Sequence, residues 1–210
     1  MPQVRTHSAV VAELRDRSGL GLHQEDEVQN LDLEILQYPI GRSSRYIENS
    51  SKNRDEWLRA IGDTPVEVRR VVCGLAEEQL DTPYRPGGWT VRQVVHHYAD
   101  DHLNSYVRFK LALTEEAPAI QLYGEALWAE LPDARLGPIE PSLRLLEALH
   151  ERWMGAWNAL AQSDWQRTFN HPKRGPVSLE QLAALYAWHG KHHVAQVRAL
   201  RVRNSWTEES

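Results

Sequence analysis

The chain has a single cysteine, Cys73, among its 210 residues. One thiol cannot form an intrachain disulfide, so the fold must be stable without such a cross-link, and this cysteine usage fits a reducing compartment. Cys73 lies in the apolar sequence VVCGL. That setting predicts a small buried side chain and not a reactive thiol.

A basic surplus is also lacking. The chain carries 24 Lys and Arg against 29 Asp and Glu, a net charge of −5. Nucleic-acid-binding proteins usually show a basic patch or stripe, so this charge balance argues against a nucleic-acid partner. No stretch approaches the roughly 20 apolar residues of a membrane span, and the N-terminal residues contain no apolar signal-peptide core. We therefore expect a cytoplasmic protein with no membrane partner.

Convincing strand alternation is missing as well, and helical periodicity takes its place. It covers four long segments: 51–80, 90–114, 142–161 and 178–202. The second and fourth segments begin with capping boxes, Thr90 with Gln93 and Ser178 with Gln181. Pro65 is expected to kink the first segment or split it in two. The pattern predicts an all-α four-helix bundle with long middle connections.

One domain accounts for most of the chain. The length suits a single bundle over residues 31–206, preceded by a weakly structured N-terminal extension (1–30) and followed by a short tail (207–210). A short helix is expected around residues 124–130, inside the long connection between the second and third helices.

Histidines gather in the last predicted helix, where YAWHGKHHVAQ holds three of the ten in the chain. At about 100° per residue, His189 and His193 lie in the middle of the apolar face that also carries Leu182 and Leu200. Two neighbouring neutral imidazoles in a core either find specific hydrogen-bond partners or bind a metal ion. The spacing alone leaves both interpretations open.

The helix from residue 90 carries a polar stripe. His97 shares one line with Asn104 and Arg108, and Asp101 lies about 40° from that line. Such a stripe is either a solvated face or one wall of a polar cleft, and charged stripes are more often solvated. His96 lies opposite the apolar face of the same helix, so we expect it to face solvent.

Three further histidines have different settings. His102 lies near the centre of the apolar face of its helix, which predicts a hydrogen-bonded core histidine. His150 also lies on an apolar face and is a candidate partner behind a metal ligand. His171 lies in a predicted loop, either at the mouth of a cleft or in solvent.

Two long motifs, residues 84–120 and LYAWHGKHH at 185–193, closely resemble the YfiT-type branch of the DinB-like superfamily. The likeness begins near YPIG at 38–41 and continues through the last helix, whereas residues 1–30 have no counterpart. The resemblance implies a four-helix bundle in which three histidines hold one divalent metal ion, nickel or zinc. Open positions on the ion then remain for water or substrate.

On the matching positions, the implied ligands are His97, His189 and His193, in agreement with the helical wheels. The resemblance also favours a cleft wall over a solvated face for the polar stripe on the second helix. Gln196 stands where some relatives have another histidine, so the resemblance supports no additional histidine ligand there.

The resemblance implies two kinds of chemistry, metal-dependent hydrolysis and the transfer of low-molecular-weight thiols, bacillithiol in particular, to electrophiles. A metal ion with an open position lowers the pKa of a bound water or thiol, which serves either reaction. Arg108 and Asn104 are candidates to hold an anionic group of a small-molecule substrate, and Asp101 is a candidate acceptor for a ligand N–H.

We expect an enzyme that transfers a thiol to an electrophilic small molecule. A hydrolase that uses metal-bound water is the alternative, and a protein that only binds a metal or a small ligand is the contrasting class. The eight tryptophans and several apolar loop residues exceed what one small bundle needs to bury, which predicts a homodimer.

Overall fold

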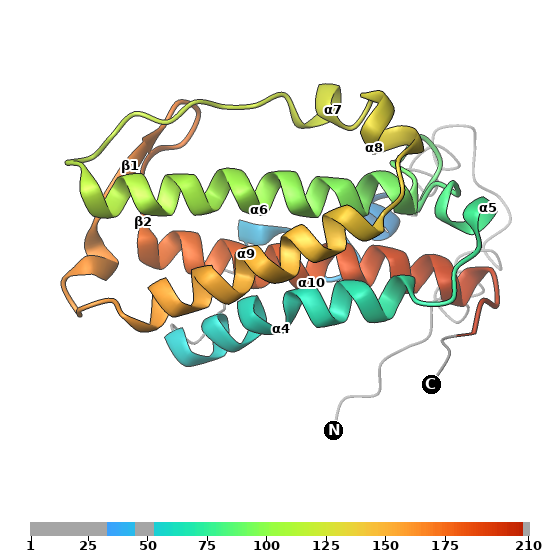
Figure 1. The fold of residues 1–210 in the computed structure, drawn as a ribbon, viewed down its shortest axis with the longest axis horizontal. Helices are drawn as coiled ribbons and strands as arrows, with labels where there is room; N and C mark the ends of the chain where they lie inside the picture. The colour runs from blue at the N-terminus through green and yellow to red at the C-terminus, as the bar shows by residue number, and fades with distance from the viewer. Residues whose placement is uncertain (1–32, 45–52, 208–210) are drawn as a thin grey trace, which may run out of the picture.

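The structure, a computed structural model, describes residues 33–44 and 53–207 (Figure 1). Its four long helices are α4 (Arg54–Val72), α6 (Val91–Thr114), α9 (Glu140–Asn158) and α10 (Leu179–Arg203). They form the predicted four-helix bundle, in which α10 packs along α4 and α9 contacts both α4 and α6. The N-terminal extension expected at 1–30 lies outside the described residues.

The helices α6 and α10 begin where their capping boxes predict. The hydroxyl of Thr90 accepts from the backbone N–H of Gln93 at 3.2 Å, and the Gln93 side chain accepts from the Thr90 N–H at 2.9 Å. Ser178 and Gln181 repeat the arrangement at 3.1 and 2.9 Å. These bonds satisfy N–H groups that have no partner inside the helix, so both helix starts are defined locally.

Of the two outcomes expected at Pro65, a kink or a split, the split does not occur, because α4 is continuous through this residue. Pro65 is buried, and the apolar residues on both sides of it, Ile61 and Val68 among them, pack into the core. This packing outweighs the cost of about 3 kcal/mol for proline inside a helix. Proline has no N–H, so the carbonyl of Ile61, four residues earlier, receives no helical hydrogen bond from position 65.

The connections contain six short elements: α5 (Glu77–Leu80), α7 (Glu125–Trp128), α8 (Pro132–Leu136), η1 (Asp164–Gln166), β1 (Thr168–His171) and β2 (Gly175–Ser178). The expected short helix at 124–130 is α7. The antiparallel hairpin β1–β2 corrects the expectation of a chain without strands, and it pairs Phe169 with Val177. Its strands have four residues each, too few for alternation to be recognised in the sequence.

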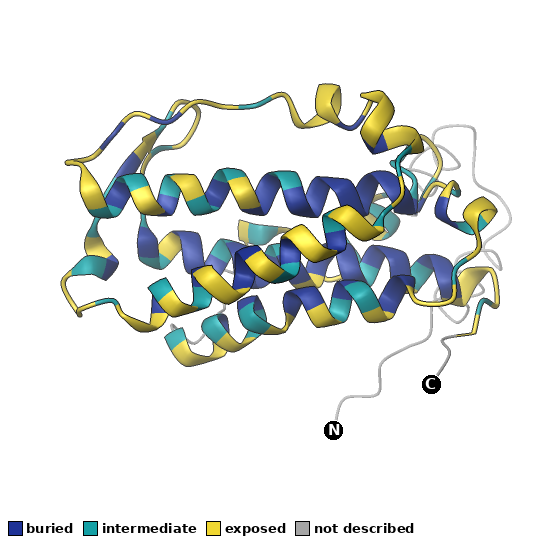
Figure 2. Ribbon diagram, viewed as in Figure 1, coloured by how far each residue is buried: buried dark blue, intermediate teal, exposed yellow. Residues whose placement is uncertain are grey.

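Figure 2 shows the buried residues along the sides of the long helices that face one another, and most of these residues are apolar. Five of the eight tryptophans are buried: Trp57, Trp153, Trp157, Trp165 and Trp188. The tryptophan content that suggested an interface therefore serves mostly the core.

Cys73 is exposed, contrary to the prediction of a buried thiol. It forms the C-cap of α4, where the chain leaves the helix, while its apolar neighbours Val71 and Val72 occupy the buried positions. Among the described helices, none combines the length and the apolar character that crossing a membrane requires.

Candidate metal centre

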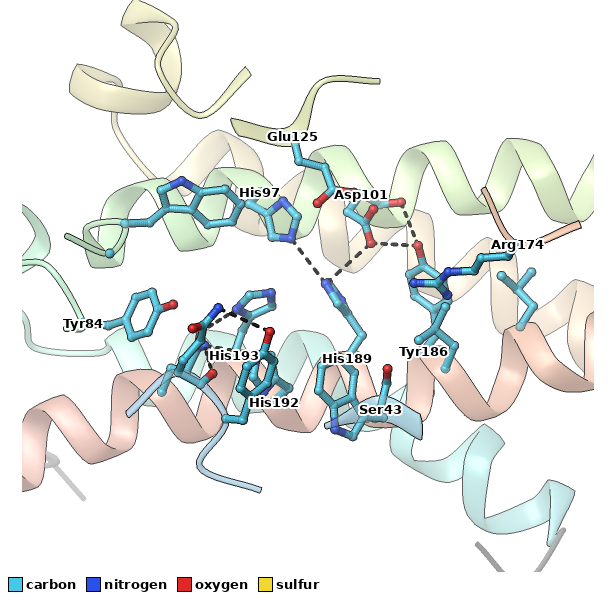
Figure 3. Close-up of a pocket in the computed structure, with 18 of the residues that line it drawn as sticks. Ser43, Tyr84, His97, Asp101, Glu125, Arg174, Tyr186, His189, His192 and His193 are labelled. Carbon is cyan, nitrogen blue, oxygen red and sulfur yellow. Dashed lines mark hydrogen bonds and ion pairs between the residues drawn. The ribbon is translucent and has the colours of Figure 1, made fainter. Parts of the chain in front are cut away.

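Three imidazoles converge between α6 and α10, those of His97, His189 and His193 (Figure 3). One ring nitrogen from each lies within 4.8 Å of the others, and the Nε2 atoms of His97 and His189 are 3.3 Å apart. Two nitrogens bound at about 2.1 Å to one tetrahedral zinc ion would be about 3.4 Å apart. The structure thus brings the three predicted ligands together at a separation that fits one ion.

A glycine between the two α10 histidines brings this helix close to its neighbours. A Cβ atom on Gly190 would overlap Oγ1 of Thr64 on α4. The Tyr98 hydroxyl on α6 donates to the Gly190 carbonyl at 2.6 Å. The glycine in WHGKHH therefore allows α10 to approach α4 while a hydrogen bond ties it to α6.

Burial keeps the three imidazoles neutral at neutral pH. Desolvation lowers the pKa of His97, and it lowers the pKa of His189 and His193 well below the usual 6.5. The neighbouring histidines lower the last two further, because a second positive charge nearby would repel the first. A neutral imidazole keeps one lone pair, which is the form that binds a metal ion.

Gln196 fixes the tautomer of His193. Its side-chain oxygen lies 2.7 Å from Nδ1 of His193, and an amide oxygen only accepts, so Nδ1 carries the proton and Nε2 keeps the lone pair. The Gln196 amide nitrogen donates to the backbone carbonyl of Gln37 at 2.7 Å. Gln196 thereby connects a metal-ligand candidate to residues 33–44, which are visible between α6 and α10 in Figure 1.

Asp101 lies on the side of His189 that faces the other ligands. Its Oδ2 is 3.6 Å from Nε2 of His189, whereas Nδ1 of His189 contacts His102 at 3.0 Å. The carboxylate accepts hydrogen bonds from Tyr186 at 2.7 Å and from Tyr123 at 3.1 Å. Asp101 is therefore not the acceptor behind the ligand that the sequence suggested. It faces the space where an ion and its bound molecules would lie.

A cavity of about 570 Å³ opens beside the three imidazoles. Arg108 and His171 line it, as a cleft wall requires. Asn104 does not line the cavity, because its amide donates to the carbonyl of Asp100 one turn earlier at 2.8 Å. The stripe on α6 is thus a buried wall at its His97 end and not a solvated face.

The expected solvent exposure of His96 is wrong. His96 is 9% exposed, and its Nδ1 lies 2.8 Å from the hydroxyl of Ser142. The turn between α8 and α9 covers this side of α6, with the carbonyl of Gly137 at 3.3 Å from Nε2. A helical wheel cannot foresee a connection that folds back over the polar face.

Sequence reasoning missed several charged residues of the cavity wall, among them Glu125 and Arg174. Figure 3 shows Glu125 beside Asp101, and Arg174 among the other side chains that line the cavity. Burial raises the pKa of Glu125, and the nearby charge of Asp101 raises it further. Both residues come from connecting segments, where no periodicity indicates which way a side chain points.

Comparison with known proteins identifies the family of the chain. The model of the DinB superfamily matches residues 60–197. A Bacillus mycoides protein named "putative metal-dependent hydrolase" is 49% identical over 171 residues, which cover 81% of this chain and 98% of the relative. A Bacillus anthracis protein of the same name is 50% identical with the same coverage.

A solved structure shares the fold. YfiT from Bacillus subtilis, described as a probable metal-dependent hydrolase with an unusual four-helix bundle topology, superposes with a TM-score of 0.76 at 44% identity. The match covers 82% of this chain and 99% of YfiT. The chain therefore belongs to the DinB superfamily.

Proposed function

We propose that the protein is a metal-dependent enzyme that transfers a low-molecular-weight thiol, of the bacillithiol type, to an electrophilic small molecule. A nickel or zinc ion held by His97, His189 and His193 supplies Lewis acidity, which lowers the pKa of a bound thiol. The observation that carries the proposal is the arrangement of three neutral imidazoles beside a cavity of about 570 Å³. That volume is large enough for two small reactants.

The carboxylate of Asp101 orients the incoming nucleophile. Its Oδ2 lies next to Nε2 of His189, and the hydroxyls of Tyr186 and Tyr123 hold it in place. From this position it accepts a hydrogen bond from a thiol or a water on the cavity side of the imidazoles.

Two arginines supply the positive charge for an anionic substrate group. Arg108 on α6 and Arg174 in the turn of the hairpin line the same cavity. Within the described residues, neither guanidinium forms a hydrogen bond or an ion pair. Both charges help to lower the pKa of His171, after desolvation. A guanidinium pair suits a carboxylate or a phosphate, so we propose an anionic thiol or an anionic electrophile as substrate.

Hydrolysis is the second candidate, and the names of the relatives favour it. The same residues would then orient a water molecule in place of the thiol. A protein that only binds a metal or a small ligand would show no turnover with either class of substrate.

Steady-state turnover of the metal-loaded protein tests the proposal. Thiol and electrophile supplied together are compared with an ester supplied without thiol. His193→Ala should abolish turnover, and Arg108→Ala should weaken substrate use without loss of metal. His96→Gln, which alters a buried histidine outside the cavity, serves as the control. Equal rates in the wild type, His193→Ala and Arg108→Ala would refute the assigned site, and ester turnover without thiol would favour the hydrolase.

We also propose that two copies of the chain form a homodimer and that the protein acts in the cytoplasm. The part of the chain that supports dimerisation is the connection through α7 and α8, where Leu127 is 75% exposed and Leu136 is 79% exposed. Leu131 and Trp128 add apolar surface to the same segment. The cytoplasmic assignment rests on the single cysteine.

A further inference from the structure

A chain of hydrogen bonds runs from His189 through all four long helices. Nδ1 of His189 on α10 lies 3.0 Å from Nε2 of His102 on α6. Nδ1 of His102 lies 2.7 Å from Nε2 of His150 on α9. Nδ1 of His150 lies 2.8 Å from the backbone carbonyl of Ile61 on α4. Each bond joins a different pair of helices.

The last acceptor fixes the direction of every bond in this chain. A carbonyl oxygen only accepts, so the proton of His150 is on Nδ1. A neutral imidazole has one N–H, so Nε2 of His150 accepts and Nδ1 of His102 donates. By the same rule, Nε2 of His102 accepts a hydrogen bond from Nδ1–H of His189. The lone pair of His189 is then on Nε2, the atom that faces His97.

Pro65 makes the Ile61 carbonyl available as this acceptor. In an uninterrupted helix, the N–H of residue 65 would bond to the carbonyl of residue 61. Proline lacks that N–H, and α4 nevertheless continues past it, so a carbonyl in the middle of a helix has room for a side-chain donor. His150 occupies that position.

The same geometry excludes a proton route to solvent. His102 is 0% exposed and His150 is 2% exposed. The chain ends at an amide carbonyl, which has no exchangeable proton to give and does not retain one at ordinary pH. These histidines therefore hold the orientation of a ligand and do not carry protons away from the centre.

We propose that His102 and His150 are positioning residues, which together with the Ile61 carbonyl hold His189 in its Nδ1–H tautomer and present its Nε2 to the metal ion. The role of Nε2 as a ligand rests on the proposed function. The tautomer itself is a property of the metal-free protein and can be measured without any ion.

The test combines two measurements, nitrogen-15 NMR of the histidines in the metal-free protein and zinc affinity by competition with a chelator. In the wild type we expect the Nδ1–H tautomer for His189. His150→Leu removes the group that accepts the hydrogen bond from Nδ1–H of His102. The bond between His102 and His189 can then reverse its direction, which places the proton of His189 on Nε2. The affinity for zinc should therefore fall about 10- to 100-fold. His150→Gln supplies an amide oxygen for His102 and an amide N–H for Ile61, and should restore most of the affinity.

His96→Gln is the matched control. His96 is buried and lies in α6, as His102 does, but its partners Ser142 and Gly137 do not belong to the chain of hydrogen bonds. It should leave both the tautomer of His189 and the zinc affinity unchanged. An Nε2–H tautomer of His189 in the wild type would overturn the proposal, and this measurement needs no variant to fold. A zinc affinity of folded His150→Leu within twofold of wild type would also overturn it. Absence of zinc binding by the wild type would instead count against the proposed function. The tautomer of His189 in the metal-free protein would still show whether His102 and His150 set the position of its proton.

Discussion

The Nε2 atoms of His97 and His189 lie 3.3 Å apart, although 92 residues separate them in the chain. Hydrogen bonds behind His189 and His193 fix which nitrogen of each ring faces the cavity. The protein thus arranges the nitrogen donors of the candidate centre before any ion is bound. Binding of an ion then costs less conformational entropy, because the side chains are already ordered.

We predict one divalent ion per chain, bound by His97, His189 and His193. His189→Ala should lose the ion, because two imidazoles bind a divalent cation far more weakly than three. Metal content after exhaustive dialysis measures this. His171→Ala, a cavity histidine outside the group of three, should keep the full content. Equal metal content in wild type and His189→Ala would refute the ligand assignment.

We predict that Gly190→Ala destabilises the bundle by about 1–3 kcal/mol, the usual cost of overpacking. The new methyl group would overlap Oγ1 of Thr64, so α10 must move away from α4. Urea denaturation of the metal-free protein measures the change.

Gly155→Ala is the control for this substitution. Gly155 lies in α9, and apart from its chain neighbours and the backbone of its own helix no heavy atom lies within 4 Å of the place that an added methyl group would take. Alanine should therefore stabilise the helix there by up to about 1 kcal/mol through its higher helix propensity. The opposite order, with Gly190→Ala the more stable variant, would show that α10 does not need a close approach to α4.

We predict that the metal-free protein loses stability as the pH falls below 6.5. Burial lowers the pKa of His150 from 6.5 to about 4, so the unfolded chain binds more protons than the folded one between these values. By linkage, this one group should lower the free energy of unfolding by about 2 kcal/mol as the pH falls from 7 to 5. His150→Gln cannot titrate, so its free energy of unfolding should fall less over the same interval. Parallel pH curves for the two proteins would contradict the assignment.

We predict a homodimer in solution, formed through the exposed apolar residues of α7 and α8. Leu136→Lys should shift the light-scattering mass toward the monomer, because it places a charge in the proposed interface. Val202→Lys, an exposed apolar position at the end of α10, is the control and should not change the mass. A monomeric mass of the wild type over a wide concentration range would disprove the dimer.

The sequence predicts those features that depend on local periodicity. Thr90 and Ser178 mark the starts of α6 and α10 through capping bonds within four residues. The placement of His189 and His193 on an apolar face follows from the same short-range pattern. His102, predicted as a hydrogen-bonded core histidine, is confirmed at 0% exposure with two histidine partners.

What the sequence could not predict depends on how the connections fold. His96 becomes buried because the turn before α9 covers it, and Glu125 reaches the cavity from α7. Asn104 shares a line with Arg108 on the helical wheel, but its short side chain bonds to its own helix instead of reaching the cavity. A helical wheel gives the direction in which a side chain leaves the helix. It shows neither how far the side chain extends nor which other segment packs against that face.

Because of Pro65, the candidate metal centre depends on α4, a helix that supplies none of the three proposed ligands. The carbonyl that it frees belongs to α4, and the contacts that follow belong to α9 and α6 before they reach α10. Fraying of a helix end leaves this path intact, whereas separation of any one helix from the bundle interrupts it. A bound ion should therefore be released in the same transition in which the whole bundle unfolds. A metal-sensitive dye and circular dichroism should give the same midpoint for this transition.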